Sequence, residues 1–446
     1  MNAQQVDTLI TDGLVLSLEP DAAPIDSGWV AVRNGAIVDL GSGTGRPAGI
    51  QAEETIDAAG CLVMPGLVNS HVHGAMALFR GLADDLPLMT WLNEHIFPAE
   101  SNHVNEDLVY WGTRLACAEM LLSGTTCFAD GYFLEDQASR AVLDTGMRAV
   151  LGQGVIDFPA PGVPDPNRNV ENAREFLARW QGASPLLSPA VFCHSPYTCS
   201  PETLIRGKAL ARETGTIFQI HLAETSAEVE QIRSERGLTP ARYLESLDLL
   251  DDHTLAVHCV HLDDDEVALL AQHGTSAVVC VESQMKLASG VAPIPQMLAQ
   301  GVNVALGTDG PASNNDLNLF GEMRSLALLF KAVGLDPTVL PASQTTALAG
   351  PAGAQALGMA DKIGILAPGF RADLIILELN RPHLKPLYHP YSHLVYSATG
   401  REIRHVLVDG RVLVRNGRPT LFDLTETMQR CREIAVNIRS RLGEAI

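Results

Sequence analysis

The sequence predicts an α/β fold, namely a (β/α)8 TIM-type barrel with a small β-sandwich domain built from both chain termini. Two patterns lead to this prediction. In the middle of the chain, apolar strand-like runs alternate with longer helix-like stretches, which is typical of parallel strands joined by helices. At the two ends, strand-like alternation flanks short turn sequences. A chain of 446 residues is long enough for one large domain and one small one.

The terminal segments carry two matching hairpin signals. The stretch "WVAVRNGAIVDLG" alternates around Asn34-Gly35, and "IRHVLVDGRVLVRNG" alternates around Asp409-Gly410. Both dipeptides favour the type I′ turn of a two-residue hairpin. We therefore expect residues 1–60 and 367–446 to form one small β-sandwich domain with a C-terminal helix. Residues 61–366 would be an insertion whose two ends lie close together.

The central segment contains eight strand candidates, and this number favours a closed barrel over an open doubly wound sheet. In chain order they are "CLVMPGLVNSHVH", "TTCFAD", "RAVLGQGV", "PAVFCHSP", "TIFQIHLAE", "TLAVHCVH", "SAVVCVES" and "VNVALGTDG". Helix-like stretches such as "EDLVYWGTRLACAEMLLSG" and "SPETLIRGKALARETG" lie between them. Because such barrels carry their chemistry at the carboxyl ends of the strands, the residues found there are the candidates for function.

Composition excludes several classes of partner. The net charge of −21 argues against nucleic acid, whose phosphates need a basic face. No apolar run approaches membrane-spanning length, and the opening "MNAQQVDTLITDG" has no signal-peptide pattern. The eight cysteines are spread singly, which suits reduced thiols in a cytoplasmic protein. We expect the protein to bind a small molecule and not to associate with a membrane. The sequence is compatible with a homo-oligomer.

Polar side chains follow most of the predicted barrel strands. His71 and His73 flank Val72, so they share one face of the first strand. The fourth, fifth, sixth and eighth strands end in His194, in His221 and Glu224, in His258 and His261, and in Asp309. Each alone can be a structural residue, but a barrel gathers its strand ends into one ring, so these groups are predicted to converge.

Three histidines and a carboxylate suit a divalent transition metal of the zinc or iron(II) kind. The residues that supply this set are His71, His73, His221 and Asp309. Related barrels with two metals use a bridging modified lysine at the end of the fourth strand. This chain has five lysines, and none is near that strand end. The prediction is one metal ion, with zinc placed first and iron(II) as the alternative.

Four motifs together carry a resemblance to a known family. "PGLVNSHVH", "HLAET", "AVHCVHL" and "GTDGPASNND" resemble the amidohydrolase superfamily, in particular its S-adenosylhomocysteine and 5′-methylthioadenosine deaminase branch. The resemblance covers essentially the whole chain. It implies that the four metal ligands are those named above, and that Glu224 and His258 act beside the metal. His261, which the strand alternation places on the opposite face, is interpreted as structural.

The resemblance implies hydrolytic deamination. A zinc-type ion lowers the pKa of bound water from about 15.7 to about 7. Asp309 would then take the water's proton, Glu224 would protonate the ring nitrogen, and His258 would hold the attacking oxygen. The substrate contacts implied are Trp91 and Glu100, in the stretch over the barrel mouth, together with His194 and Glu224.

Two features leave the substrate open within this branch. Val281 stands where the family usually has proline, and Gln284 stands where it usually has asparagine. The family also binds an amino-acid tail with arginines, for which Arg168 is the one candidate noted here. The leading prediction is a mononuclear metal-dependent aminohydrolase of 5′-methylthioadenosine, S-adenosylhomocysteine or adenosine. The alternatives are a deaminase or chlorohydrolase of a guanine, pterin or s-triazine, and a non-catalytic scaffold.

Overall fold

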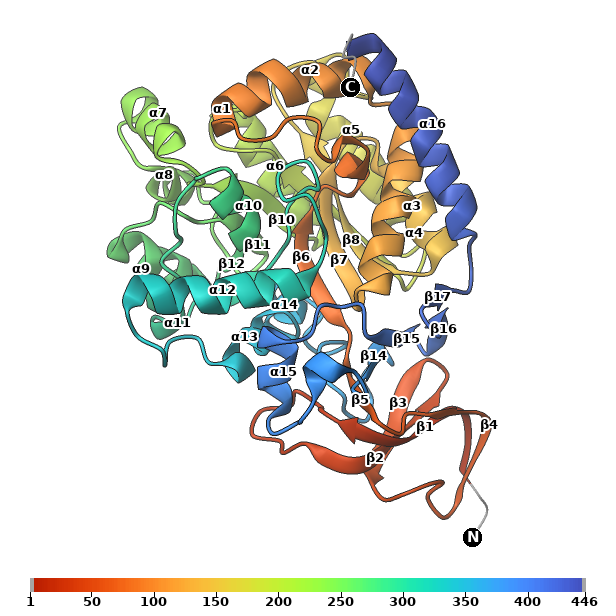
Figure 1. Cartoon of the computed structure of the whole chain (residues 1–446). Helices are drawn as coiled ribbons and strands as arrows, with labels where there is room; N and C mark the ends of the chain where they lie inside the picture. The colour runs from red at the N-terminus through yellow and green to blue at the C-terminus, as the bar shows by residue number, and fades with distance from the viewer. Residues whose placement is uncertain (1–3, 443–446) are drawn as a thin grey trace.

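Eight parallel strands form the centre of the molecule (Figure 1). The computed structural model describes residues 4–442. Each strand pairs with the next one in the chain, which confirms the predicted barrel. The strands are β6 (Leu67–Val72), β7 (Thr125–Tyr132), β8 (Arg148–Val155), β9 (Leu187–Cys193), β10 (Phe218–Leu222), β11 (Thr254–His258), β12 (Ser276–Val279) and β13 (Val304–Leu306).

The ring closes between β13 and β6 without a strand ladder between the described residues. Instead, the Asp309 amide donates to the His71 carbonyl over 3.0 Å. Just below, the Asn69 amide donates to Thr308 Oγ1 over 2.8 Å, and Asn69 Oδ1 accepts from the Thr308 N–H over 3.0 Å. Gly307 permits this approach, since a Cβ there would lie 2.9 Å from the backbone of His71.

Helices cover the outside of the barrel (Figure 1). Apolar side chains fill its inside. Alternate strand residues such as Cys127 and Ala129, or Leu255 and Val257, pack together in one cluster, as inward-facing positions of a barrel do. The helices are α3 (Glu106–Leu122), α4 (Glu135–Thr145), α5 (Asn169–Trp180), α6 (Pro201–Thr214), α7 (Ser226–Arg236), α8 (Pro240–Ser246), α9 (Asp264–His273), α10 (Val281–Lys286), α11 (Ile294–Ala299), α12 (Leu319–Gly334), α13 (Ala342–Leu348) and α14 (Pro351–Ala356).

The chain ends build a second sheet of nine strands beneath the barrel (Figure 1). Strand β1 pairs with β2 along one side and with β4 and then β5 along the other, so the sheet forks there. Both predicted hairpins form, with Asn34, Gly35, Asp409 and Gly410 all in the left-handed region. The strands are β1 (Gln4–Val15), β2 (Ile25–Arg33), β3 (Ala36–Ser42), β4 (Ile50–Asp57), β5 (Cys61–Pro65), β14 (Leu374–Glu378), β15 (Ile403–Val408), β16 (Arg411–Arg415) and β17 (Arg418–Pro419).

Strand β5 differs from the sequence-based division of the chain. The sequence analysis treated residues 61–73 as one barrel strand, but β5 pairs with β1 and β14 in the terminal sheet, and only β6 enters the barrel. Both halves are buried and apolar, so hydrophobicity alone does not separate them. We therefore propose Gly66, between them, as the start of the barrel domain.

Two further contacts join the barrel to the ends of the chain. The guanidinium of Arg148, at the start of β8, donates to both oxygens of Asp373, at 2.6 and 3.0 Å, and both side chains are buried. Helix α16 (Leu424–Leu442) runs along the barrel side and packs against α3 (Figure 1). Within residues 4–442, no helix has both the length and the apolar character needed to cross a membrane.

The remaining short elements lie in the connections. A single strap crosses the barrel mouth between β6 and α3, and part of it is a π-helical turn, a feature common at functional sites. The strap consists of α1 (Leu88–Thr90), η2 (Trp91–Ile96) and α2 (Phe97–His103). The others are η1 (Gly74–Phe79), η3 (Pro166–Arg168), η4 (Pro382–Leu384) and α15 (Pro390–Tyr396).

Candidate active site

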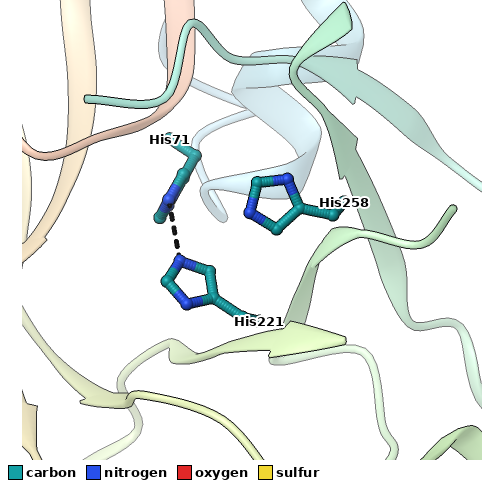
Figure 2. Close-up of side chains that lie close together, drawn as sticks. All are labelled: His71, His221 and His258. Carbon is teal, nitrogen blue, oxygen red and sulfur yellow. Dashed lines mark hydrogen bonds between the residues drawn. The ribbon is translucent and has the colours of Figure 1, made fainter. Parts of the chain in front are cut away.

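The predicted metal ligands meet at the carboxyl rim of the barrel. His71 Nε2 lies 3.2 Å from His221 Nε2 and 3.7 Å from Asp309 Oδ1. His73 Nε2 lies 3.3 Å from the same oxygen of Asp309. His258 belongs to the same cluster: its ring, with those of His71 and His221, faces a common centre (Figure 2). Residues from β6, β10, β11 and β13, far apart in sequence, are thus brought together.

The geometry and protonation of these groups fit a divalent metal. Tetrahedral zinc with bonds of about 2.0–2.1 Å needs ligand atoms about 3.4 Å apart, close to the separations found. Burial, followed by the neighbouring imidazoles, lowers the pKa of His71 and His221 well below the usual histidine value, so both are neutral. His73 Nδ1 lies 2.6 Å from the Gly131 carbonyl and donates to it, which leaves Nε2 free to ligate.

Asp309 is held in place by two serines. The hydroxyls of Ser283 and Ser313 both donate to Asp309 Oδ2, each over 2.7 Å, and the Gly310 N–H donates to Oδ1 over 2.7 Å. Burial acts to raise the pKa of Asp309. The surrounding histidines, led by His73, and the Ser283 hydrogen bond outweigh it and hold that pKa well below its usual range. The carboxylate is therefore ionised.

Glu224 is a carboxylic acid next to this cluster. Burial, with a smaller contribution from Asp309, raises the pKa of Glu224 to about 8. Its Oε2 lies 3.7 Å from His258 Nε2, and its Oε1 accepts from the Ser289 hydroxyl over 3.5 Å. Burial also lowers the pKa of His258, although Asp309 opposes the shift. Near neutral pH the site thus holds one carboxylate, Asp309, and one protonated acid, Glu224.

Buried glutamates, which the sequence analysis missed, hold the loops that carry these groups. Glu228 accepts from the N–H groups of Ala223 and Glu224, over 3.0 and 2.7 Å. Glu322 on α12 accepts from the Val281 N–H over 2.8 Å, and also from an asparagine of the loop after β13. A signal existed for Glu228, because Thr225 and Glu228 have the spacing of a helix capping box. The role of Glu322 depends on a contact across the fold.

A cavity opens beside the cluster. All four predicted substrate contacts line it: Trp91, Glu100, His194 and Glu224. Trp91 is buried, and its Nε1 donates to the Ala83 carbonyl over 3.1 Å. His194 Nδ1 lies 3.0 Å from Thr198 Oγ1. The strap therefore closes over the cavity as the sequence predicted.

Glu100 is the most unusual of the cavity residues on the strap. It is 6% exposed and accepts from the Tyr132 hydroxyl over 2.7 Å. Burial raises the pKa of Glu100 to about 7, although the Tyr132 hydrogen bond opposes the shift. Tyr132, at the end of β7, lines the same cavity and was not singled out from the sequence. A buried carboxyl group with one fixed donor is suited to bind a further polar group from a ligand.

Other residues noted in the sequence lie outside the cavity. His261 Nε2 lies 2.7 Å from the Ser289 carbonyl, as a structural histidine does. Gln284 is buried, and its amide donates to the His258 carbonyl over 3.2 Å. The side chain of Arg168 is 64% exposed, pairs with Glu175 on the surface and does not line the cavity.

The fold and site define a (β/α)8 barrel protein with a histidine and carboxylate cluster suited to a metal at its carboxyl rim. The amidohydrolase family model matches residues 62–413. The chain belongs to this family, as the sequence motifs predicted. Its relatives include proteins named 5-methylthioadenosine/S-adenosylhomocysteine deaminase. One from Syntrophobacter fumaroxidans is 47% identical over 98% of this chain and 100% of its own length. Another, from Desulforudis audaxviator, is 46% identical over 93% and 95%.

Solved structures show the same architecture. An adenosine deaminase from Xanthomonas campestris, with bound zinc, matches with a TM-score of 0.96 and 37% identity. The match covers 98% of this chain and 100% of that one. An atrazine chlorohydrolase from Arthrobacter aurescens matches with a TM-score of 0.88 at 23% identity, over 96% of this chain and 100% of its own. At that identity the likeness shows the fold alone.

Removing a ligand is predicted to remove the metal. His221→Ala deletes one of four donors, and Asp309→Asn replaces a carboxylate with a weak neutral ligand. Loss of an outer-shell partner alone costs about 10–100-fold in metal affinity, so each variant should retain far less metal than the wild type. The measurement is elemental analysis by mass spectrometry on protein purified without chelators. Exposed His253→Ala is the control, and wild-type metal content in His221→Ala would exclude His221 as a ligand.

Proposed function

We propose that this chain is a hydrolytic deaminase that removes the 6-amino group of adenosine-type nucleosides and releases ammonia. The substrates proposed are 5′-methylthioadenosine, S-adenosylhomocysteine and adenosine. One observation carries the proposal: the buried Glu100 and Tyr132 pair shares one cavity with the histidine and carboxylate cluster. A carboxylate can accept from both hydroxyls of a ribose, whereas a free base offers no such pair. The names of relatives at 46–47% identity agree with this choice.

We further propose one divalent metal ion, zinc in the first place and iron(II) as the alternative, held by the four predicted ligands. The donor set, the ligand-atom separations and the zinc in the adenosine deaminase structure support zinc. When bound, such an ion supplies a water molecule that ionises near neutral pH. A cytoplasmic location is proposed because all eight cysteines are free and buried.

The proton transfers are assigned to Asp309 and Glu224. Asp309, whose Oδ2 accepts from Ser283 and Ser313, takes the proton of the attacking water. Glu224, protonated at neutral pH, donates to the ring nitrogen next to the attacked carbon. His258 orients the attacking oxygen through Nε2. Asp309 then passes the water's proton to the amine, the C–N bond breaks and ammonia leaves. The proton of the new hydroxyl group returns to Glu224 as the C–O bond becomes a carbonyl.

The alternatives have less support. The triazine and guanine enzymes among the solved structures are 22–24% identical to this chain, which shows a shared fold only. A scaffold without activity has no need of a complete ligand set, a protonated Glu224 and a shaped cavity in one place.

An ammonia-release screen tests the proposal. The metal-loaded protein is offered adenosine, 5′-methylthioadenosine and S-adenosylhomocysteine, and also guanine, a pterin and an s-triazine. Ammonia release from nucleosides and little or none from free bases and triazines is the expected result. Release only from guanine, the pterin or the triazine would assign the chain to another reaction of the family, and release from none would favour the scaffold.

Glu224→Gln is predicted to keep the metal and lose turnover. The amide has the size of the acid but cannot transfer a proton, so kcat should fall by about 10²–10⁴-fold. In the wild type, kcat/KM should decline as the pH rises through about 8, because Glu224 is active when protonated. Steady-state kinetics and metal analysis check both statements. Exposed Glu230→Gln on α7, which follows Glu224 in the chain, is the control, and loss of metal from Glu224→Gln would make Glu224 a ligand.

Glu100→Ala is predicted to weaken nucleoside recognition. Hydrogen bonds to charged groups are worth about 1.5–3 kcal/mol, so kcat/KM for adenosine should fall roughly 10–100-fold. A 2′,3′-dideoxy analogue should be a poor substrate for the wild type and lose little more in the variant. That double comparison isolates the ribose contact. The control is Glu94→Ala, an exposed position on the same strap, and equal loss with the dideoxy analogue would refute the contact.

A further inference from the structure

The charge of the cavity is one-sided. Among the described residues that line it, three carry a carboxyl group, Glu100, Glu224 and Asp309, and none is a lysine or an arginine. The proposed metal is therefore the only full positive charge that we assign to the cavity. Asp309 and three histidines would hold that ion. A negatively charged group on a ligand has no partner there.

An apolar belt surrounds the outer part of this cavity. Leu88, Leu92, Ile96 and Phe97 from the strap, and Leu287 after α10, line it. Leu88 and Leu287 also line a second groove on the outer surface, so these two buried side chains stand between the cavity and that groove. A substituent that leaves the cavity on this side must pass between Leu88 and Leu287, and we call this place the exit.

The cations nearest this exit already have partners. Lys286 lines the outer groove and donates to Asp84 over 2.5 Å and to Asn315 Oδ1. Asp85 lines the same groove and adds a negative charge beside it. Arg80 is likewise bonded to both oxygens of Glu119. In the part of the chain that the structure describes, neither the cavity wall nor this exit offers an unpaired cation to a carboxylate.

We propose that this enzyme selects adenosine nucleosides whose 5′ substituent is uncharged, such as a methylthio group, and discriminates against the charged tail of an amino acid. The inference rests on the proposed function and narrows its substrates. A thioether and its methyl group pack well against apolar side chains. A carboxylate taken from water into the same belt loses its hydration and gains no partner, which is strongly unfavourable.

Three substrates that differ only at the 5′ position test the proposal. They are 5′-methylthioadenosine, S-adenosylhomocysteine and 5′-butylthio-5′-deoxyadenosine, whose tail has a similar length without charge. We expect kcat/KM for S-adenosylhomocysteine to be about 10–100-fold below that for 5′-methylthioadenosine. The butylthio compound should stay within about threefold, because only charge is penalised.

The outcomes separate the two proposals. S-adenosylhomocysteine within threefold of 5′-methylthioadenosine would overturn the inference and leave the deaminase function intact. An equally poor butylthio compound would also overturn it, since length and not charge would then decide. Release of ammonia from no nucleoside would instead refute the proposed function itself.

A positive charge placed at the exit should weaken the preference. Leu287→Arg puts a guanidinium beside the tail, and Leu287→Met is the matched control for the changed packing. The ratio of kcat/KM for S-adenosylhomocysteine to that for 5′-methylthioadenosine should rise about tenfold in the arginine variant and not in the methionine variant. Leu88→Arg and Leu88→Met repeat the test at the other leucine. An unchanged ratio in both folded, metal-loaded arginine variants would overturn the proposal.

Discussion

The close approach of the first and last barrel strands is the constraint on which the site depends. His71 and Asp309 are 238 positions apart in the sequence, yet the amide of one donates to the carbonyl of the other. No ladder sets the register of β13 on β6; the reciprocal bonds of Asn69 and Thr308 set it instead. Any side chain at Gly307 would push these strands apart and separate the ligands. The contact that closes the barrel therefore also positions His71 and Asp309 in the candidate metal site.

The same rim contains an unusual concentration of left-handed backbone at residues with side chains. Ala223, His258 and Asp309 have φ values of 51°, 75° and 62°, a conformation that costs about 1–3 kcal/mol for such residues. Buried acceptors stabilise these turns: Glu228 binds two N–H groups at Ala223 and Glu224, and Asp309 binds the N–H that follows it. The strained turns point the side chains inward, and the buried glutamate of α7 keeps them there.

The sequence predicted the strands and the polar residues at their ends better than it predicted the side chains that hold those polar residues in place. Eight apolar runs, each followed by polar residues, are local patterns, and the barrel topology then brings the polar residues together. Ser283 and Ser313 both donate to the same oxygen of Asp309, Oδ2. Such a contact depends on the folded geometry and cannot be read from a local sequence pattern. For the same reason β5 was assigned to the barrel, since a buried strand of either sheet has the same composition, and Arg168 was considered for the site although it lies on the surface.

Specificity within this fold must come from elements that the shared barrel does not fix. The triazine and guanine enzymes share the fold at 22–24% identity, so the fold alone does not choose a substrate. In this chain we propose that the choice lies with the strap, which places Glu100 against Tyr132 of β7 and lines the cavity with apolar side chains. Polar recognition is thus confined to two places, the reacting end and the Glu100 and Tyr132 pair. Between them and the exit, the wall favours groups that carry no charge.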